Sequence, residues 1–88
     1  MIRRRVIVHG LVQGVFFRDT VRRLALGANV AGWARNNWDG TVEAVFEGEA
    51  GPVERLVSFC REGPRGARVD GVAVTDEPRE GLQGFRIG

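Results

Sequence analysis

Residues 3–18 read RRRVIVHGLVQGVFFR, and this stretch combines a strand, a glycine-bracketed loop and the beginning of a helix. Residues 3–9 are rich in β-branched side chains and end at Gly10, which is typical of a strand. Val6 and Val8 share one face of that strand, so we expect them in the core.

A helical pattern follows the loop. Apolar residues recur at i, i+4, i+7, i+8 and i+11 from Phe17, which marks one face of a helix. We expect this helix to begin between Phe17 and Thr20 and to end near Gly27. Asp19 in its first turn complements the positive end of the helix dipole.

The rest of the chain predicts four more strands and a second helix. Asp39-Gly40 between two strand-like runs is a strong hairpin signal. Pro52 suits the first turn of a helix that ends at Gly63-Pro64. The predicted strands cover residues 30–36, 41–47, 69–75 and 85–87.

This order of elements predicts an α+β ferredoxin-like sandwich, βαββαβ with a short extra C-terminal strand. We expect one antiparallel sheet with both helices on one face and the second strand beside the first. In the third strand, we expect Glu43 and Glu47 on a polar face that only Val45 interrupts. A chain of 88 residues allows one domain, so residues 1–88 are predicted to form a single unit.

Composition narrows the class of protein. The chain is 43% hydrophobic and 27% charged, as soluble domains are, and no stretch approaches the ~18 apolar residues of a membrane span. With Cys60 as the only cysteine, we expect no disulfide, no metal site and a cytoplasmic location. All 13 basic residues are arginine, which suits phosphate binding. A GC-rich codon bias explains the missing lysines more simply.

The loop at residues 10–18 admits two interpretations. Gly10 and Gly14 permit a curled backbone whose N–H groups point inward as an anion nest, and the helix that follows adds its positive end. Arg18 at the junction suits two phosphoryl oxygens. The alternative is a tight turn with a solvated arginine, and the loop alone favours this turn.

Asn36 and Asn37 end the second predicted strand. An asparagine amide can hold a water through its oxygen, but asparagines before Trp-Asp-Gly are also ordinary turn residues. Strand parity does not decide which of the two side chains would face the loop.

Two spaced motifs resemble a known family. GLVQGVFFR resembles the first signature of the acylphosphatases, G-x-V-Q-G-V-x-F-R. Residues 32–48, GWARNNWDGTVEAVFEG, resemble the second signature, with Gly40, Val42 and Gly48 at its spacings. The stretches GPRGARVDGV and GFRI are also similar, so the resemblance spans nearly the whole chain.

The resemblance implies a role for several residues. Arg18 matches the arginine that binds the phosphoryl group, and Asn36 matches the asparagine that positions the attacking water. The loop whose amides surround the phosphate is matched by Leu11, Val12, Gln13, Gly14 and Val15. Phe16 departs from the pattern, because a smaller residue often occupies this position, and we expect it to affect substrate preference.

The resemblance also implies an activity. Acylphosphatases hydrolyse small acyl phosphates, such as acetyl phosphate, to a carboxylate and inorganic phosphate without a metal or cofactor. We also expect a cytoplasmic monomer with no nucleic-acid or membrane partner. Because a carboxylate leaves readily, the reaction needs positioning and charge stabilisation more than acid catalysis.

Other conspicuous residues have plainer interpretations. His9 is expected to be solvated or structural, and Cys60 to be a buried small hydrophobe. Residues 3–5 are interpreted as a solvated strand edge. For Trp33 and Trp38 we expect core or turn packing.

A binding module is the alternative to an enzyme, since fold alone does not fix function. An RNA-recognition domain would carry the pattern K/R-G-F/Y-G/A-F-V-x-F/Y, whereas residues 41–47 read TVEAVFE. A regulatory domain that binds phosphate without turnover stays open as an alternative.

Overall fold

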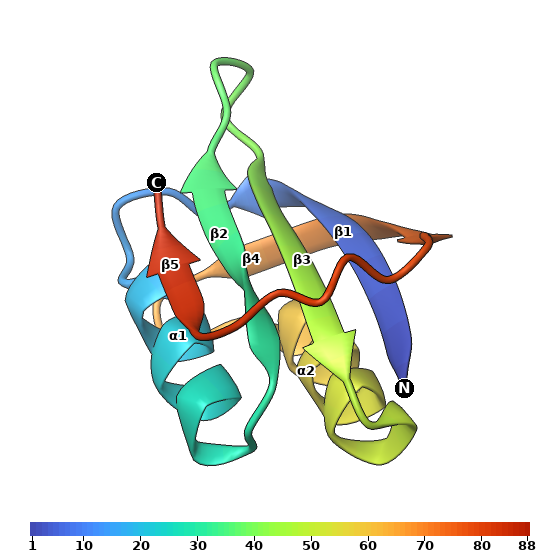
Figure 1. Cartoon of the computed structure of the whole chain (residues 1–88). Coiled ribbons are helices and arrows are strands. Elements are labelled where there is room, and N and C mark those ends of the chain that lie inside the picture. The colour runs from blue at the N-terminus through green and yellow to red at the C-terminus, as the bar shows by residue number, and fades with distance from the viewer.

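A computed structural model describes residues 1–88, and its elements follow the predicted order. The strands are β1 (Ile2–Leu11), β2 (Ala31–Asn36), β3 (Val42–Gly48), β4 (Arg68–Asp76) and β5 (Phe85–Ile87), and the helices are α1 (Phe17–Gly27) and α2 (Ala50–Glu62). Both helices lie on one face of the sheet (Figure 1). The predicted ferredoxin-like sandwich is confirmed.

The five strands follow the order β4-β1-β3-β2-β5. The first four strands pair antiparallel, while β5 pairs parallel with β2, so the sheet is mixed rather than wholly antiparallel. The expectation that β2 lies beside β1 is wrong. The crossover through α1 leaves one strand position free, and β3 fills it by pairing with β1 on one edge and β2 on the other.

The core lies between the sheet and the helices. Alternation along β1 and β3 and the helical periodicity of α1 and α2 turn apolar side chains toward this layer. The 16 buried residues of this core are Val6, Val8, Val12, Phe17, Val21, Ala25, Val30, Ala34, Val42, Ala44, Phe46, Val53, Leu56, Val57, Cys60 and Phe85. The core thus includes Val12 from the loop and Cys60, whose predicted burial is confirmed.

The sheet face opposite the helices is also covered. Residues 77–84, which join β4 to β5, cross this face in front of β1 and β3 (Figure 1). Glu43, Val45 and Glu47 are therefore buried rather than solvated. We call residues 77–84 the strap.

The interpretation of residues 3–5 as a solvated edge is wrong. β1 is an interior strand, and Arg3 is only 4% exposed. Its guanidinium lies 3.4 Å from Glu47 and 3.1 Å from Glu77, carboxylates supplied by β3 and the strap. Arg5 pairs with Glu43 and Glu77 on the same face.

Candidate active site

The end of β1 sends the chain into the loop through a bulge. The pairing of β1 with β4 shifts between His9 and Gly10, and Gly10 has a φ of 132°. A Cβ on Gly10 would lie 2.0 Å from the carbonyl oxygen of Arg68. Only glycine fits here, because both the backbone angle and the approach of β4 exclude a side chain.

Residues 12–16 form the loop between β1 and α1, which we call the phosphate loop after the role that the sequence resemblance predicts for it. Gly14 and Phe16 have φ values of 76° and 59°, whereas the other residues of this loop, Val12, Gln13 and Val15, do not have positive φ. Such alternation turns successive N–H groups to one side as a nest. None of the N–H groups of residues 12–16 donates a hydrogen bond within the protein.

Phe16 adopts a conformation that is costly for a residue with a Cβ. Its carbonyl oxygen accepts hydrogen bonds from the backbone N–H of Thr20 at 3.0 Å and the Thr20 hydroxyl at 2.8 Å. Its ring is 79% exposed. The strained backbone is therefore held by the first turn of α1 and not by burial of the ring.

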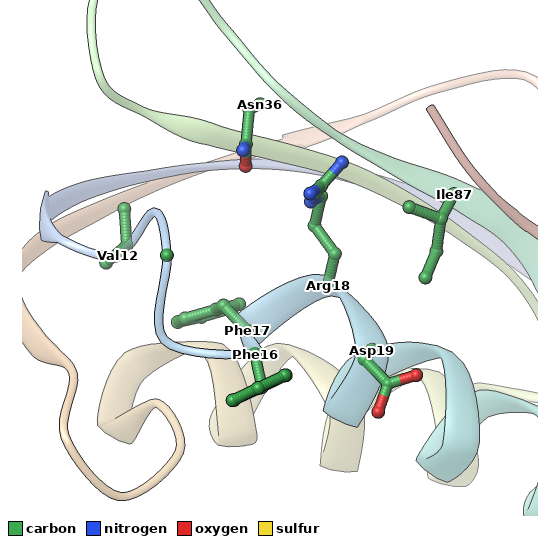
Figure 2. Close-up of a pocket in the computed structure, with 8 residues that line it drawn as sticks. Val12, Phe16, Phe17, Arg18, Asp19, Asn36 and Ile87 are labelled. Atoms are coloured by element: carbon green, nitrogen blue, oxygen red, sulfur yellow. The ribbon is translucent and has the colours of Figure 1, made fainter.

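A cleft of about 240 Å³ opens between the phosphate loop, α1, β2 and β5. Figure 2 shows Asn36 at the end of β2 and Arg18 on the first turn of α1 converging on the same space above the loop. Its lining residues are Val12, Gly14, Phe16, Phe17, Arg18, Asp19, Asn36 and Ile87. The structure thus brings together the predicted arginine, the first predicted asparagine and two of the five predicted loop residues.

The Arg18 guanidinium has one hydrogen bond within the protein. Its Nη1 donates to the carbonyl oxygen of Gly88, directly after β5. Its remaining N–H groups have no protein partner. A guanidinium held at one nitrogen keeps its other donors available for an oxyanion.

The two asparagines have different surroundings. Asn37 Nδ2 donates to Thr41 Oγ1 at 3.0 Å and to Glu43 Oε1 at 3.2 Å, so this amide stabilises the hairpin between β2 and β3. The side chain of Asn36 has no hydrogen-bond partner and lines the cleft. The structure thereby separates two residues that strand parity left equivalent.

The other three predicted loop residues do not line the cleft. Leu11 is the last residue of β1 and is paired with Arg68, and Val15 packs against the core. Gln13 Nε2 donates to the carbonyl oxygens of Asn37 at 2.8 Å and Thr41 at 3.0 Å. Gln13 therefore connects the phosphate loop to the hairpin that follows Asn36, a contact that the sequence analysis missed.

Sequence reasoning also missed the contribution of β5. Ile87 lines the cleft, and Gly88 contacts Arg18. A three-residue strand at the end of the chain carries little periodicity, so its position at the site was not predictable from pattern. Asp19, the only carboxylate of the cleft, is paired with Arg23 at 3.2 Å.

The remaining candidates lie away from the cleft. His9 is exposed, which agrees with a solvated residue. Burial raises the pKa of the Cys60 thiol to about 12, so it is a poor nucleophile. The Trp33 ring contacts the guanidinium groups of Arg5 and Arg35, which lie 5.3 and 5.0 Å from its centroid. Trp38 is fully exposed at the hairpin tip, so the expectation of packing is wrong for this residue.

No group of three or more His, Cys, Asp or Glu side chains is placed to hold a metal ion. No helix has the length and apolar character needed to span a bilayer.

Comparison with known proteins identifies the family. The acylphosphatase family model matches residues 4–87. An acylphosphatase of Rubrobacter xylanophilus is 58% identical over 94% of this chain and 76% of its own length, and one of Gloeobacter violaceus is 49% identical over 98% and 92%. The crystal structure of acylphosphatase from Bacillus subtilis superposes with a TM-score of 0.95 at 36% identity, covering 100% of this chain and 99% of that one. With a cleft that gathers an arginine, an asparagine and a loop of free N–H groups, this chain belongs to the acylphosphatase family of hydrolases.

Proposed function

We propose that the cleft hydrolyses small acyl phosphates by using Arg18, Asn36 and the amides of residues 11–15. The observation that carries this proposal is the convergence of Arg18 and Asn36, from separate elements, above a loop whose N–H groups at residues 12–16 have no partner in the protein. Backbone donors and a guanidinium together suit a phosphoryl dianion.

In the proposed reaction, a water attacks phosphorus and the bond between phosphorus and the acyl oxygen breaks. The carboxylate leaves with the bonding electron pair, and the proton of the water passes to phosphate oxygen or solvent. Charge spreads over the equatorial oxygens in the transition state, where the loop amides and Arg18 stabilise it. Because the leaving carboxylate needs no proton, the pairing of Asp19 with Arg23 does not hinder the reaction.

Asn36 positions the attacking water in the proposed reaction. Its amide has no protein partner, so its oxygen can accept from a water while its nitrogen donates to a phosphoryl oxygen. Holding that water in line with the breaking bond lowers the entropic cost of attack.

The test is release of inorganic phosphate from acetyl phosphate by the purified protein with EDTA present. Arg18→Ala and Asn36→Ala should each lower kcat/KM by roughly 100- to 1,000-fold, the cost of losing one transition-state donor. Asn37→Ala is the matched control. It should retain most of the activity because its amide contacts the hairpin and not the cleft.

Turnover that is indifferent to Arg18 would contradict these assignments. Phosphate binding without any turnover would instead favour a regulatory domain that keeps the site but not the activity. Activity lost on EDTA treatment would refute a reaction without metal.

We further infer that the enzyme acts as a cytoplasmic monomer with no nucleic-acid or membrane partner. A single buried free thiol suits a reducing compartment. Elution at the mass of one chain in size-exclusion chromatography with light scattering is the expected result.

A further inference from the structure

The strap curls around a buried carboxylate. Glu47 Oε1 accepts the N–H of Glu80 at 2.8 Å, and Glu47 Oε2 accepts the N–H of Leu82 at 2.8 Å. Gly81, between them, has a φ of 77°. This left-handed conformation lets consecutive N–H groups converge on one carboxylate, as in a nest.

Arg3 contacts the same carboxylate from β1. Its guanidinium lies 3.4 Å from Glu47, 3.1 Å from Glu77 and 3.3 Å from Glu80. Arg3 and Glu47 are 4% and 5% exposed. We call Glu47 and its contacts with Arg3 and the strap N–H groups the Glu47 anchor, because they fix the middle of the strap to the sheet.

The strap leads without interruption into β5, which reaches the cleft (Figure 1). The pairing of β5 with β2 is bracketed by two hydrogen bonds, Gly32 N–H to Gly84 at 2.9 Å and Gly88 N–H to Ala34 at 2.8 Å. The carbonyl oxygen of Gly88 then accepts the only hydrogen bond that the Arg18 guanidinium makes within the protein.

We propose that Glu47 is a positioning residue for the reaction and acts through the strap, β5 and the Gly88 carbonyl to orient Arg18. This inference rests on the proposed role of Arg18. β5 is only three residues long, so its position along β2 depends on the segment that leads into it. Releasing the anchor shifts the Gly88 carbonyl, and the Arg18 guanidinium turns with it.

The expected loss of activity in a protein without the Glu47 anchor follows from the sensitivity of catalysis to geometry. A misplacement of about 1 Å can cost roughly 100-fold in rate. Burial of Phe85 against Phe46, at a centroid distance of 5.9 Å, holds β5 even when the strap loosens. We therefore expect a partial loss, roughly 10-fold in kcat/KM.

Two variants test the anchor in the full-length protein. Glu47→Gln places an amide donor against strap N–H groups and Arg3. Gly81→Ala strains the curl without a clash, because no atom lies within 4 Å of the new Cβ. The matched controls are Glu80→Gln, which keeps the Glu47 contacts, and Gly66→Ala, an equally open glycine with a φ of 92° in the connection between α2 and β4, outside the strap.

Three readouts separate positioning from stability. The NMR resonance of the Arg18 Nε–H reports the guanidinium directly, inorganic phosphate affinity reports ground-state binding, and kcat/KM for acetyl phosphate reports turnover. Both anchor variants should shift the Arg18 resonance, weaken phosphate binding several-fold and lower kcat/KM roughly 10-fold. Neither control should change any of the three readouts by more than about twofold.

Combining Gly81→Ala with Arg18→Ala tests whether the effect of the strap on phosphate binding passes through Arg18. In an Arg18→Ala background, Gly81→Ala should change phosphate affinity by less than about twofold, because its effect passes through Arg18. An equal loss in both backgrounds would overturn the proposal, as would anchor variants that lose stability while the Arg18 resonance and phosphate affinity stay unchanged. The resonance does not depend on turnover, so an inactive protein would refute the proposed function and still test the anchor.

Discussion

The phosphate loop and the strap use the same backbone device for opposite purposes. Each has a glycine with positive φ that turns neighbouring N–H groups to one side, Gly14 in the loop and Gly81 in the strap. In the strap those N–H groups are bonded to Glu47 of the same chain. In the phosphate loop they have no protein partner.

An arginine completes each arrangement, and its burial reflects the purpose. Arg3 is buried and is bonded to three carboxylates of its own chain. Arg18 lines an open cleft and has only a carbonyl oxygen as partner. A nest filled by the protein's own carboxylate stabilises the fold, whereas we propose that the nest left without a partner binds a ligand.

The largest expected effect is a difference in the free energy of unfolding between the variants Arg3→Ala and Arg18→Ala. Arg3→Ala leaves the buried Glu47 carboxylate without its cation, which costs about 3–5 kcal/mol of the free energy of unfolding. Arg18→Ala should change that free energy by only about 0.5 kcal/mol, because it removes no buried pair. Urea denaturation of both variants measures this difference. Equal destabilisation would contradict the claim that Arg3 stabilises the fold whereas Arg18 does not.

Such a contrast was only partly predictable from sequence. Periodicity is a local property of the sequence. It correctly predicts that Val6 and Val8 point into the core and that the helix beginning at Phe17 has an apolar face. The burial of Arg3 follows from a contact with Glu77 across 74 residues of sequence, and no local pattern records it. The local pattern therefore predicts a solvated edge at Arg3, although the strap covers it in the structure.

The site shows the same division. Gly14 and Arg18 belong to one continuous motif, so their proximity could be predicted. The role of Asn37 in the hairpin depends on Glu43 and Thr41, and the approach of Gly88 depends on the strap. These contacts require the positions of whole strands, including the place of β3 between β1 and β2.

The next effect concerns pH. Burial alone would raise the pKa of the Glu47 carboxyl, but the N–H groups of Glu80, Leu82 and Gly81 and the Arg3 guanidinium outweigh it and hold the pKa below its usual range. Hydrogen bonds from Arg5 and Arg3 likewise lower the pKa of Glu77. A lowered pKa in the folded state means that this stabilisation is complete above about pH 4.5 and is lost as pH falls through the folded values.

Stability should therefore be level between about pH 5 and 7 and fall more steeply below about pH 4.5. Glu47→Gln should lower the free energy of unfolding at pH 7 by roughly 1.5–3 kcal/mol, the contribution of hydrogen bonds to a charged group. The same variant should also lose less stability as the pH falls below about 4.5. Denaturation at a series of pH values measures both effects. If the variant lost stability below pH 4.5 as steeply as the original protein, Glu47 would not be the source of the acid sensitivity.

The smallest expected effect is at Phe16. The ring is 79% exposed and the residue has a φ of 59°, so glycine would remove backbone strain at little cost in apolar burial. We expect Phe16→Gly to raise the free energy of unfolding by about 0.5–1 kcal/mol. Because Phe16 lines the cleft, the ratio of kcat/KM for benzoyl and acetyl phosphate should also change. Val15→Ala should destabilise instead, since Val15 packs against the core.

The most direct test of the comparison is a titration with inorganic phosphate followed by the backbone amide resonances. We expect saturable shifts for residues 12–16 and for the Nε–H of Arg18. Residues 80–82, whose amides surround Glu47, should change far less. Phosphate-induced shifts centred on the strap, or none in the phosphate loop, would contradict the claim that the loop is the open nest.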